Sequence, residues 1–228
     1  MTIHIRPINV LVMLLCIVSF LTIANILGII YILNFSPDNI YHLIRWFDFS
    51  LEVNIPTFFS TFIIMVSSIL LFVIGMTHKR MGNRYALWIL LSFIFLFLSF
   101  DETVQLHERQ VHTIRNLLDT SGYLYFAWII PYSIVLFILL LIYIRFLMRL
   151  PKTALILFLV SGGIYISGAI GMELISGNHA EQFGQNNITY YIYVTLEELI
   201  EMTGMSIFIY SLLSYISIEF KFLEFYMR

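Results

Sequence analysis

The chain has 228 residues, of which 60% are apolar and 11% charged, and its formal net charge is −2. Soluble domains carry roughly 25% charged residues, so this composition excludes a soluble globule. The charge also excludes a typical nucleic-acid-binding protein, which needs a basic face. Because Cys16 is the single cysteine, an intramolecular disulfide and a CxxC metal site are excluded too.

Six apolar stretches predict an all-α integral membrane bundle of six transmembrane helices, formed by residues 1–228 as a single domain. Each stretch reaches the roughly 20 residues that a helix needs to cross a bilayer core. Turn-forming residues separate the stretches. The first is far longer than the h-region of a signal peptide, so we expect it to be retained. The predicted spans are 8–33, 56–77, 85–106, 124–148, 153–175 and 189–217.

The charged residues divide between the two sets of span ends. Nine of the twelve Lys and Arg lie at one set, and twelve of the fourteen acids lie at the other. Lys and Arg beside spans favour the cytoplasm, so we expect both termini to be cytoplasmic and the outer face to be acidic. The nine bases are Arg6, Lys79, Arg80, Arg84, Arg145, Arg149, Lys152, Lys221 and Arg228.

The segment 40–49 lies between the first two spans. Its apolar residues recur at helical spacing, and Trp46 favours the membrane boundary. This pattern predicts a short interfacial helix across the outer mouth of the bundle, with an ordinary loop as the alternative.

The third span carries a polar stripe if it continues as one helix beyond its apolar part. Asp101, Gln105, Glu108 and His112 are spaced i, i+4, i+7 and i+11, within about 60° of one face. His107 is then expected on the other side of the helix. A histidine among carboxylates is a ligand set that suits a divalent metal.

The fifth span repeats small residues at Gly163, Ser167 and Gly171, and Glu173 follows this repeat. A small-xxx-small pattern predicts that another helix approaches closely on this face.

The sixth span places Glu197 and Glu201 one turn apart, with Glu198 offset by about 100°. Like charges at this spacing destabilise a helix, so the pair needs a cation, a shared proton or water. Counted at 1.5 Å per residue from the basic ends, the acids of the third, fifth and sixth spans reach a similar depth, about 24–32 Å. We therefore expect them to meet in one cavity that opens to the outer side.

These patterns predict a divalent-metal site, with zinc, manganese or iron as candidates, in an enzyme that acts on a lipid or another amphiphile. Glu102 and Glu198 are the predicted catalytic carboxylates. Whether His107, His179 or Glu52 joins the site is left open. The predicted metal ligands are Asp101, Glu108, His112, Glu173, Glu197 and Glu201.

Three other interpretations fit the same residues. The acids could be solvated helix ends, favoured at a helix start by the macrodipole. A cation- or proton-coupled transporter or channel subunit would also place acids inside spans. The third is a non-catalytic membrane assembly protein. Membrane lipids are the expected partners, and association with further copies of the chain is left open.

Three segments together resemble a group of small bacterial multipass membrane proteins. These proteins carry an acidic Asn-x-Pro-Thr entry, an Asp-Glu then His-Glu helix, and a Glu-Glu-x-x-Glu helix. The matching residues here are Asn54-Ile55-Pro56-Thr57, Asp101-Glu102 with His107-Glu108, and Glu197-Glu198 with Glu201. The resemblance implies an uncharacterised family and a location in a bacterial inner membrane, and it names no reaction.

Overall fold

The structure is a computed structural model, and it describes residues 6–35 and 41–220. Within these ranges the chain is helical and contains no strand. Two short elements, η1 and η2, are a 3₁₀ turn and a π-helical turn. The elements are α1 (Pro7–Asn34), α2 (Tyr41–Ile44), α3 (Ile55–Arg80), α4 (Ala86–Val104), α5 (Leu106–Leu118), η1 (Gly122–Leu124), α6 (Ile129–Leu147), α7 (Lys152–Ile166), η2 (Ser167–Met172), α8 (Glu173–Phe183) and α9 (Ile188–Glu219).

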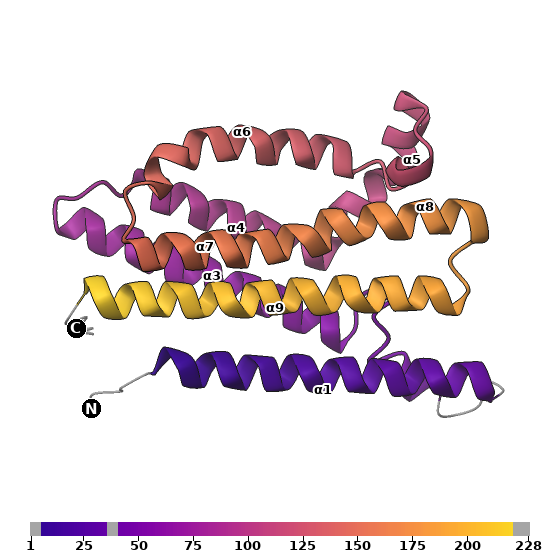
Figure 1. Cartoon of the computed structure of the whole chain (residues 1–228). Helices are drawn as coiled ribbons and strands as arrows, with labels where there is room; N and C mark the ends of the chain where they lie inside the picture. Colours follow the sequence, from indigo (N-terminus) through magenta and orange to yellow (C-terminus); the bar gives the residue numbers. More distant parts are fainter. Residues whose placement is uncertain (1–5, 36–40, 221–228) are drawn as a thin grey trace.

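Six helical segments are long and apolar enough to cross a membrane, which confirms the predicted six-span bundle. The fifth of them is continuous from Lys152 to Phe183, because α7, η2 and α8 follow one another without a break. It therefore extends eight residues beyond the predicted end at residue 175. The spans run along a common direction, side by side (Figure 1).

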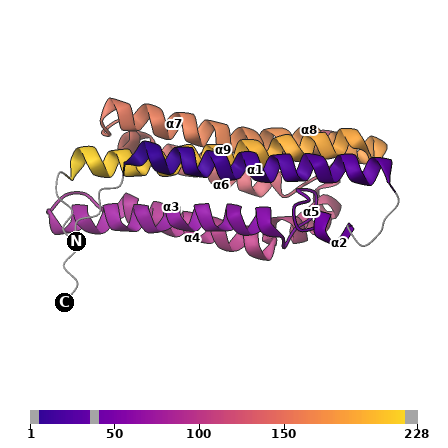
Figure 2. The ribbon, with the colours of Figure 1, turned by 90° about the horizontal axis from the view of Figure 1, so that it is seen from below.

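Helix α9 lies at the centre of the bundle and packs against α1, α3 and α7. Figure 2 shows the α3–α4 hairpin beside the layer that contains α1, α7 and α9. The main core lies between these helices and contains Leu21, Ile63, Leu71 and Leu212, each no more than 2% exposed.

Two glycines permit the closest helix contacts. A Cβ atom on Gly204 of α9 would lie 2.7 Å from the backbone nitrogen of Tyr165 in α7. A Cβ on Gly168 of η2 would lie 2.7 Å from Cγ of Glu201 and 3.0 Å from the carbonyl oxygen of Glu197. The prediction that another helix approaches closely on the small-residue face of the fifth span is therefore wrong. A Cβ at Gly163 or at Gly171 would meet nothing within 4 Å.

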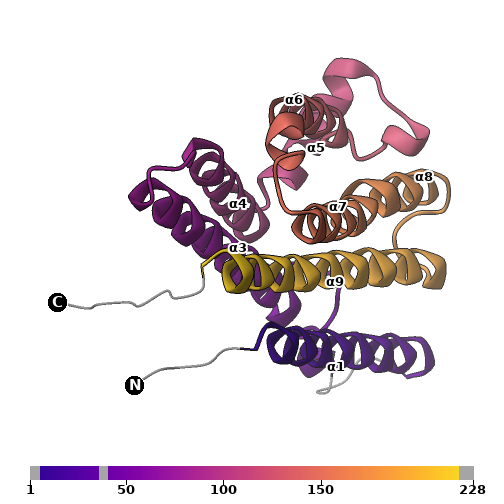
Figure 3. The same cartoon turned by 60° about the vertical axis from the view of Figure 1, so that its left-hand side comes forward.

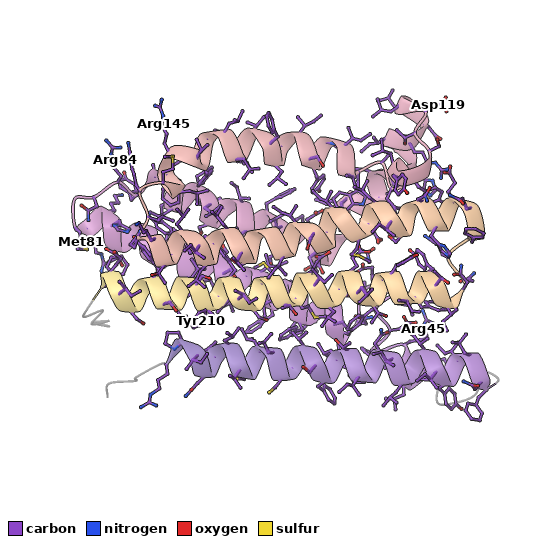
Figure 4. The ribbon with its side chains drawn as sticks, viewed as in Figure 1. Arg45, Met81, Arg84, Asp119, Arg145 and Tyr210 are labelled. Carbon is purple, nitrogen blue, oxygen red and sulfur yellow. The ribbon has the colours of Figure 1, made fainter. Side chains whose placement is uncertain are left out.

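The two ends of the bundle differ in charge. Figure 4 labels Arg84 and Arg145 at one end and Asp119 at the other. We call these the base-rich end and the acid-rich end. Helix α1 begins and α9 ends at the base-rich end (Figure 1). Lys221 and Arg228, two of the nine bases that predict the orientation, lie outside the described residues.

The third span does not continue as one helix. Gln105 has a left-handed backbone conformation with φ of 59°, so α4 ends at Val104 and α5 starts in a new direction. This break overturns the predicted stripe of Asp101, Gln105, Glu108 and His112, because the residues on either side of Gln105 do not share one helical face.

Segment 40–49 contains a single helical turn, α2, followed by turns. Ile40 lies outside the described residues. A Cβ on Gly28 of α1 would lie 2.7 Å from Cγ2 of Ile44, so α2 packs closely on α1. The amide nitrogen of Phe49 donates to Oδ1 of Asn25, which is buried in α1. These contacts fix the segment against α1 at the acid-rich end.

Candidate functional site

The break at Gln105 brings His107 back onto Asp101. The backbone nitrogen of His107 donates to Oδ1 of Asp101 at 3.1 Å, and its Nδ1 lies 3.2 Å from Oδ2. The hydroxyl of Tyr132 in α6 donates to the same Oδ2 at 3.0 Å. Asp101 is only 4% exposed. Its carboxylate thus fixes the imidazole and leaves Nε2 available for another group, the arrangement typical of a metal-ligating or catalytic histidine.

Trp128, directly before α6, contacts the fifth span close to His107. Its indole nitrogen donates to Oε1 of Glu173 at 2.9 Å, and its ring lies 4.9 Å from the His107 ring. Trp128 also packs with Val111 and Ile129 in a small second core. This core holds α5 over the acid-rich end of α6, so Glu173 and His107 face the same region.

Glu52 enters from the loop that precedes α3. Asn54 stabilises this loop, since its amide nitrogen donates to the carbonyl oxygens of Asp48 and Leu51, while its Oδ1 caps α3 at the nitrogen of Thr57. The hydroxyl of Thr57 donates to Oε2 of Glu52 at 3.2 Å. The acidic Asn-x-Pro-Thr entry thus combines a proline-started helix with a fixed carboxylate.

Helix α9 supplies three carboxylates beside the π-helical turn η2. Glu197 and Glu201 lie against Gly168, which has no side chain to hold them away. Oε2 of Glu197 is buried and accepts no hydrogen bond from a described donor, while the Glu197 carboxyl lies within hydrogen-bond reach of the Glu173 carboxyl. A buried carboxylate oxygen without a partner is costly, so this atom calls for a proton or a cation. π-helical turns are frequent at functional sites.

Electrostatic interactions join these groups into one set. Glu102 interacts with Glu52, His107 and Glu108. Glu198 interacts with Glu102, Glu201 and Glu173. We call the set the acidic cluster: Glu52, Asp101, Glu102, His107, Glu108, Glu173, Glu197, Glu198 and Glu201. It contains eight carboxyl groups and one imidazole, so it cannot be fully ionised without counter-charge.

The cluster includes most of the predicted site residues and omits one. His112 is exposed in α5 and makes none of the contacts described above. His107, which was expected on the far side of a continuous helix, instead pairs with Asp101 and interacts with Glu102 and Glu108. Glu52 joins the cluster, whereas His179 has Asn187 as its partner, at 2.8 Å from Nε2 to Oδ1.

Tyr190 of α9 interacts with Glu173 and Glu197 and so borders the cluster.

Three cluster groups lie outside the membrane-spanning segments. Burial raises the pKa of Glu52, against the opposing effects of His107 and Thr57. Partial desolvation and then the charge of Glu52 raise the pKa of Glu108, although its side chain is exposed at the surface. Burial alone would lower the pKa of His107, but the hydrogen bond and charge of Asp101, with further carboxylates nearby, raise it to about 9. The imidazole therefore carries a proton at neutral pH and partly compensates the negative charge.

Within residues 6–35 and 41–220, no three His, Cys, Asp or Glu side chains are already arranged so that they could hold a metal ion. Carboxylates of the cluster would have to rotate about their side-chain bonds to share one cation.

The family model for a domain of unknown function, DUF8692, matches residues 10–216. The chain belongs to this family. The match reaches all six spans, leaving out only the first three residues of α1 and the last three of α9, and it includes every residue of the acidic cluster. No curated protein and no solved structure matches the chain. An uncharacterised family is what the sequence motifs implied, and the family carries no activity that could be transferred to this member.

Proposed function

We propose that the chain is a divalent-cation-dependent membrane enzyme that acts on a lipid or another amphiphile at the acid-rich end. The observation that carries the proposal is the crowding of the Glu197 carboxyl against Glu173, Glu198 and Glu201, with no described donor for its buried Oε2. A divalent cation removes the mutual repulsion of several carboxylates more effectively than single protons do, and it can activate a bound water. Zinc, manganese and iron are the candidates.

The roles of the residues follow from their positions. We assign Glu108, Glu173, Glu197 and Glu201 to cation binding, with Asp101 as the group that orients His107. Glu102 and Glu198, which interact with each other and with the carboxyls assigned to the cation, are the candidates for a general base. The Asp101–His107 hydrogen bond supports a ligand role for Nε2 of His107, which would release its proton when a cation binds.

An amphiphilic substrate is supported by the loose packing of α6. Two tyrosine hydroxyls of α6 donate hydrogen bonds to α4. Tyr132 donates to Asp101, and Tyr143 donates to the carbonyl oxygen of Leu87. Between these two tyrosines no residue of α6 is buried. Figure 3 shows α6 set apart from α9, with α7 between them. This sparse packing supports an approach of a lipid chain to the cluster beside α6.

The orientation is part of the proposal. The base-rich end carries Arg6, Lys79, Arg80, Arg84, Arg145, Arg149 and Lys152. The positive-inside rule therefore favours cytoplasmic termini, and the motif resemblance favours a bacterial inner membrane.

Mass spectrometry of lipids in proteoliposomes tests the proposal. We expect wild-type chain supplied with Mn²⁺, Zn²⁺ or Fe²⁺ to convert a lipid of a bacterial extract, and we expect EDTA or Glu197→Gln to stop the conversion. Glu219→Gln is the matched control, because Glu219 is an exposed acid at the other end of the same helix. Cation or proton flux without lipid conversion would replace the enzyme by a transporter. Loss of stability as the sole effect of Glu197→Gln would indicate an assembly protein.

A further inference from the structure

A cavity of about 310 Å³ lies at the acid-rich end, between α2 and the start of α3. Arg45 and Trp46 line one side, and Glu52 and Asn54 line the other. The cavity therefore joins an arginine to a member of the acidic cluster. Figure 4 labels Arg45 at this end of the molecule.

Arg45 is one of three arginines in the described chain at the acid-rich end, beside Arg109 and Arg115. Arg115 is already used, since its guanidinium lies 3.3 Å from Oε1 of Glu181 and 4.0 Å above the Tyr125 ring. Arg45 forms no ion pair with any described carboxylate, although it shares its cavity with Glu52. Glu52 instead accepts a hydrogen bond from the Thr57 hydroxyl and interacts electrostatically with His107.

The segment that carries Arg45 is fixed at the level of lipid head groups. Ile44 packs on Gly28, which lies six residues, or about 9 Å, from the acid-rich end of α1. With 28 residues α1 is about 42 Å long, roughly 12 Å longer than a bilayer core. Arg45 therefore lies near the boundary of the core, where the exposed Trp46 ring also favours the interface.

We infer that this cavity binds the phosphate group of an anionic amphiphile, so that the substrate class of the proposed enzyme is a phosphate-bearing lipid. The guanidinium is the side chain best suited to phosphate, because its N–H groups match two phosphate oxygens at once. An anionic head group would be repelled by the acidic cluster alone, and Arg45 offsets this repulsion at the edge of the cluster. The assignment of a substrate rests on the proposed function, whereas binding of the phosphate does not.

Hydrogen bonds hold the loop that lines the cavity in one conformation. Val53 has φ of 59°, a conformation that a β-branched residue adopts only at a cost. The hydrogen bonds of Asn54 and the backbone bond from Ile55 to the carbonyl oxygen of Trp46 hold the loop in this state. Strain of this kind is concentrated at functional sites.

Native mass spectrometry of the full chain in detergent with EDTA tests the inference. The probes are dioleoyl phosphatidic acid, dioleoylglycerol as the matched lipid without phosphate, and inorganic phosphate as a competitor. We expect the phosphatidic acid to bind more tightly than dioleoylglycerol, and Arg45→Gln to weaken it on the order of tenfold. Arg109→Gln is the control and should leave binding unchanged.

Equal effects of Arg45→Gln and Arg109→Gln, or equal binding of the two lipids, would overturn the inference. Displacement of the lipid by millimolar phosphate, with Arg45-dependent binding of phosphate itself, would identify free phosphate as the ligand and also overturn the lipid assignment. Because EDTA is present, binding can succeed while the proteoliposome assay shows no conversion, in which case the proposed function fails and the phosphate site stands. If Arg45→Gln leaves lipid conversion unchanged, the proposed function stands and the phosphate site fails.

Discussion

Replacement of Gly168 by alanine should separate the fifth span from α9 at the acidic cluster. The new Cβ would lie 2.7 Å from Cγ of Glu201, 3.0 Å from the carbonyl oxygen of Glu197 and 3.2 Å from the nitrogen of Glu201. Ordinary contacts begin near 3.4 Å, so the side chain must move by about 0.7 Å and the backbone by about 0.4 Å. Overpacking of this kind costs roughly 1–3 kcal/mol.

Gly163→Ala is the matched control, because a Cβ at Gly163 meets nothing within 4 Å. Both substitutions gain up to about 1 kcal/mol of helix propensity, so their difference in stability reports the packing cost. At roughly 2–4 °C per kcal/mol for a chain of this size, Gly168→Ala should unfold about 2–12 °C below Gly163→Ala. Tryptophan fluorescence during heating in mild detergent measures this difference. Equal unfolding temperatures would refute the contact and the position of Glu197 and Glu201 against η2.

Three further predictions concern the supports of the site and the orientation. Asn25→Leu should destabilise the chain by about 1–3 kcal/mol, because the amide of Phe49 loses its buried acceptor; denaturant unfolding measures this, and a cost equal to that of Ser19→Ala would contradict it. In EDTA, the stabilising effect of His107 should be complete below its ordinary pKa of 6.5 and lost as the pH rises through about 9. The unfolding temperature should thus fall more steeply over this range in the wild type than in His107→Gln, and parallel profiles would reject the Asp101 interaction. Reporter fusions after residues 81 and 151 should be cytoplasmic and those after 118 and 184 external, and the reverse pattern would invert the proposed topology.

The spans were predictable because each depends on a long apolar stretch, which the sequence displays directly. The grouping of Glu173, Glu197 and Glu201 was predictable for a related reason, since distance along a straight helix fixes depth. Charge asymmetry then placed these acids at one end before any tertiary contact was known.

The pairing of His107 with Asp101 was not predictable from helical periodicity. Helical periodicity applies only to a helix that continues through Gln105, and neither glycine nor proline marks the break there. The left-handed residue turns α5 so that His107 reaches Asp101, and it removes His112 from the site. A break without sequence punctuation is set by tertiary contacts, here including the hydrogen bond from Tyr132 to Asp101.

The packing face of the fifth span was mispredicted for a similar reason. A repeat of small residues shows where an approach is sterically allowed, but it does not show which face a neighbour occupies. Gly168, outside the repeat, makes the close contact with α9. The π-helical turn over Ser167–Met172 also shifts the angular positions that an uninterrupted α-helix would give.

Metal analysis of the purified chain tests the central claim most directly. Inductively coupled plasma mass spectrometry of protein in mild detergent, with and without added Zn²⁺, Mn²⁺ or Fe²⁺, should find about one equivalent or more of a divalent cation in the wild type and in Glu219→Gln. A folded, monodisperse Glu197→Gln/Glu201→Gln double variant should lose it. Wild-type chain that retains no divalent cation under any of these conditions would contradict a cation-binding acidic cluster.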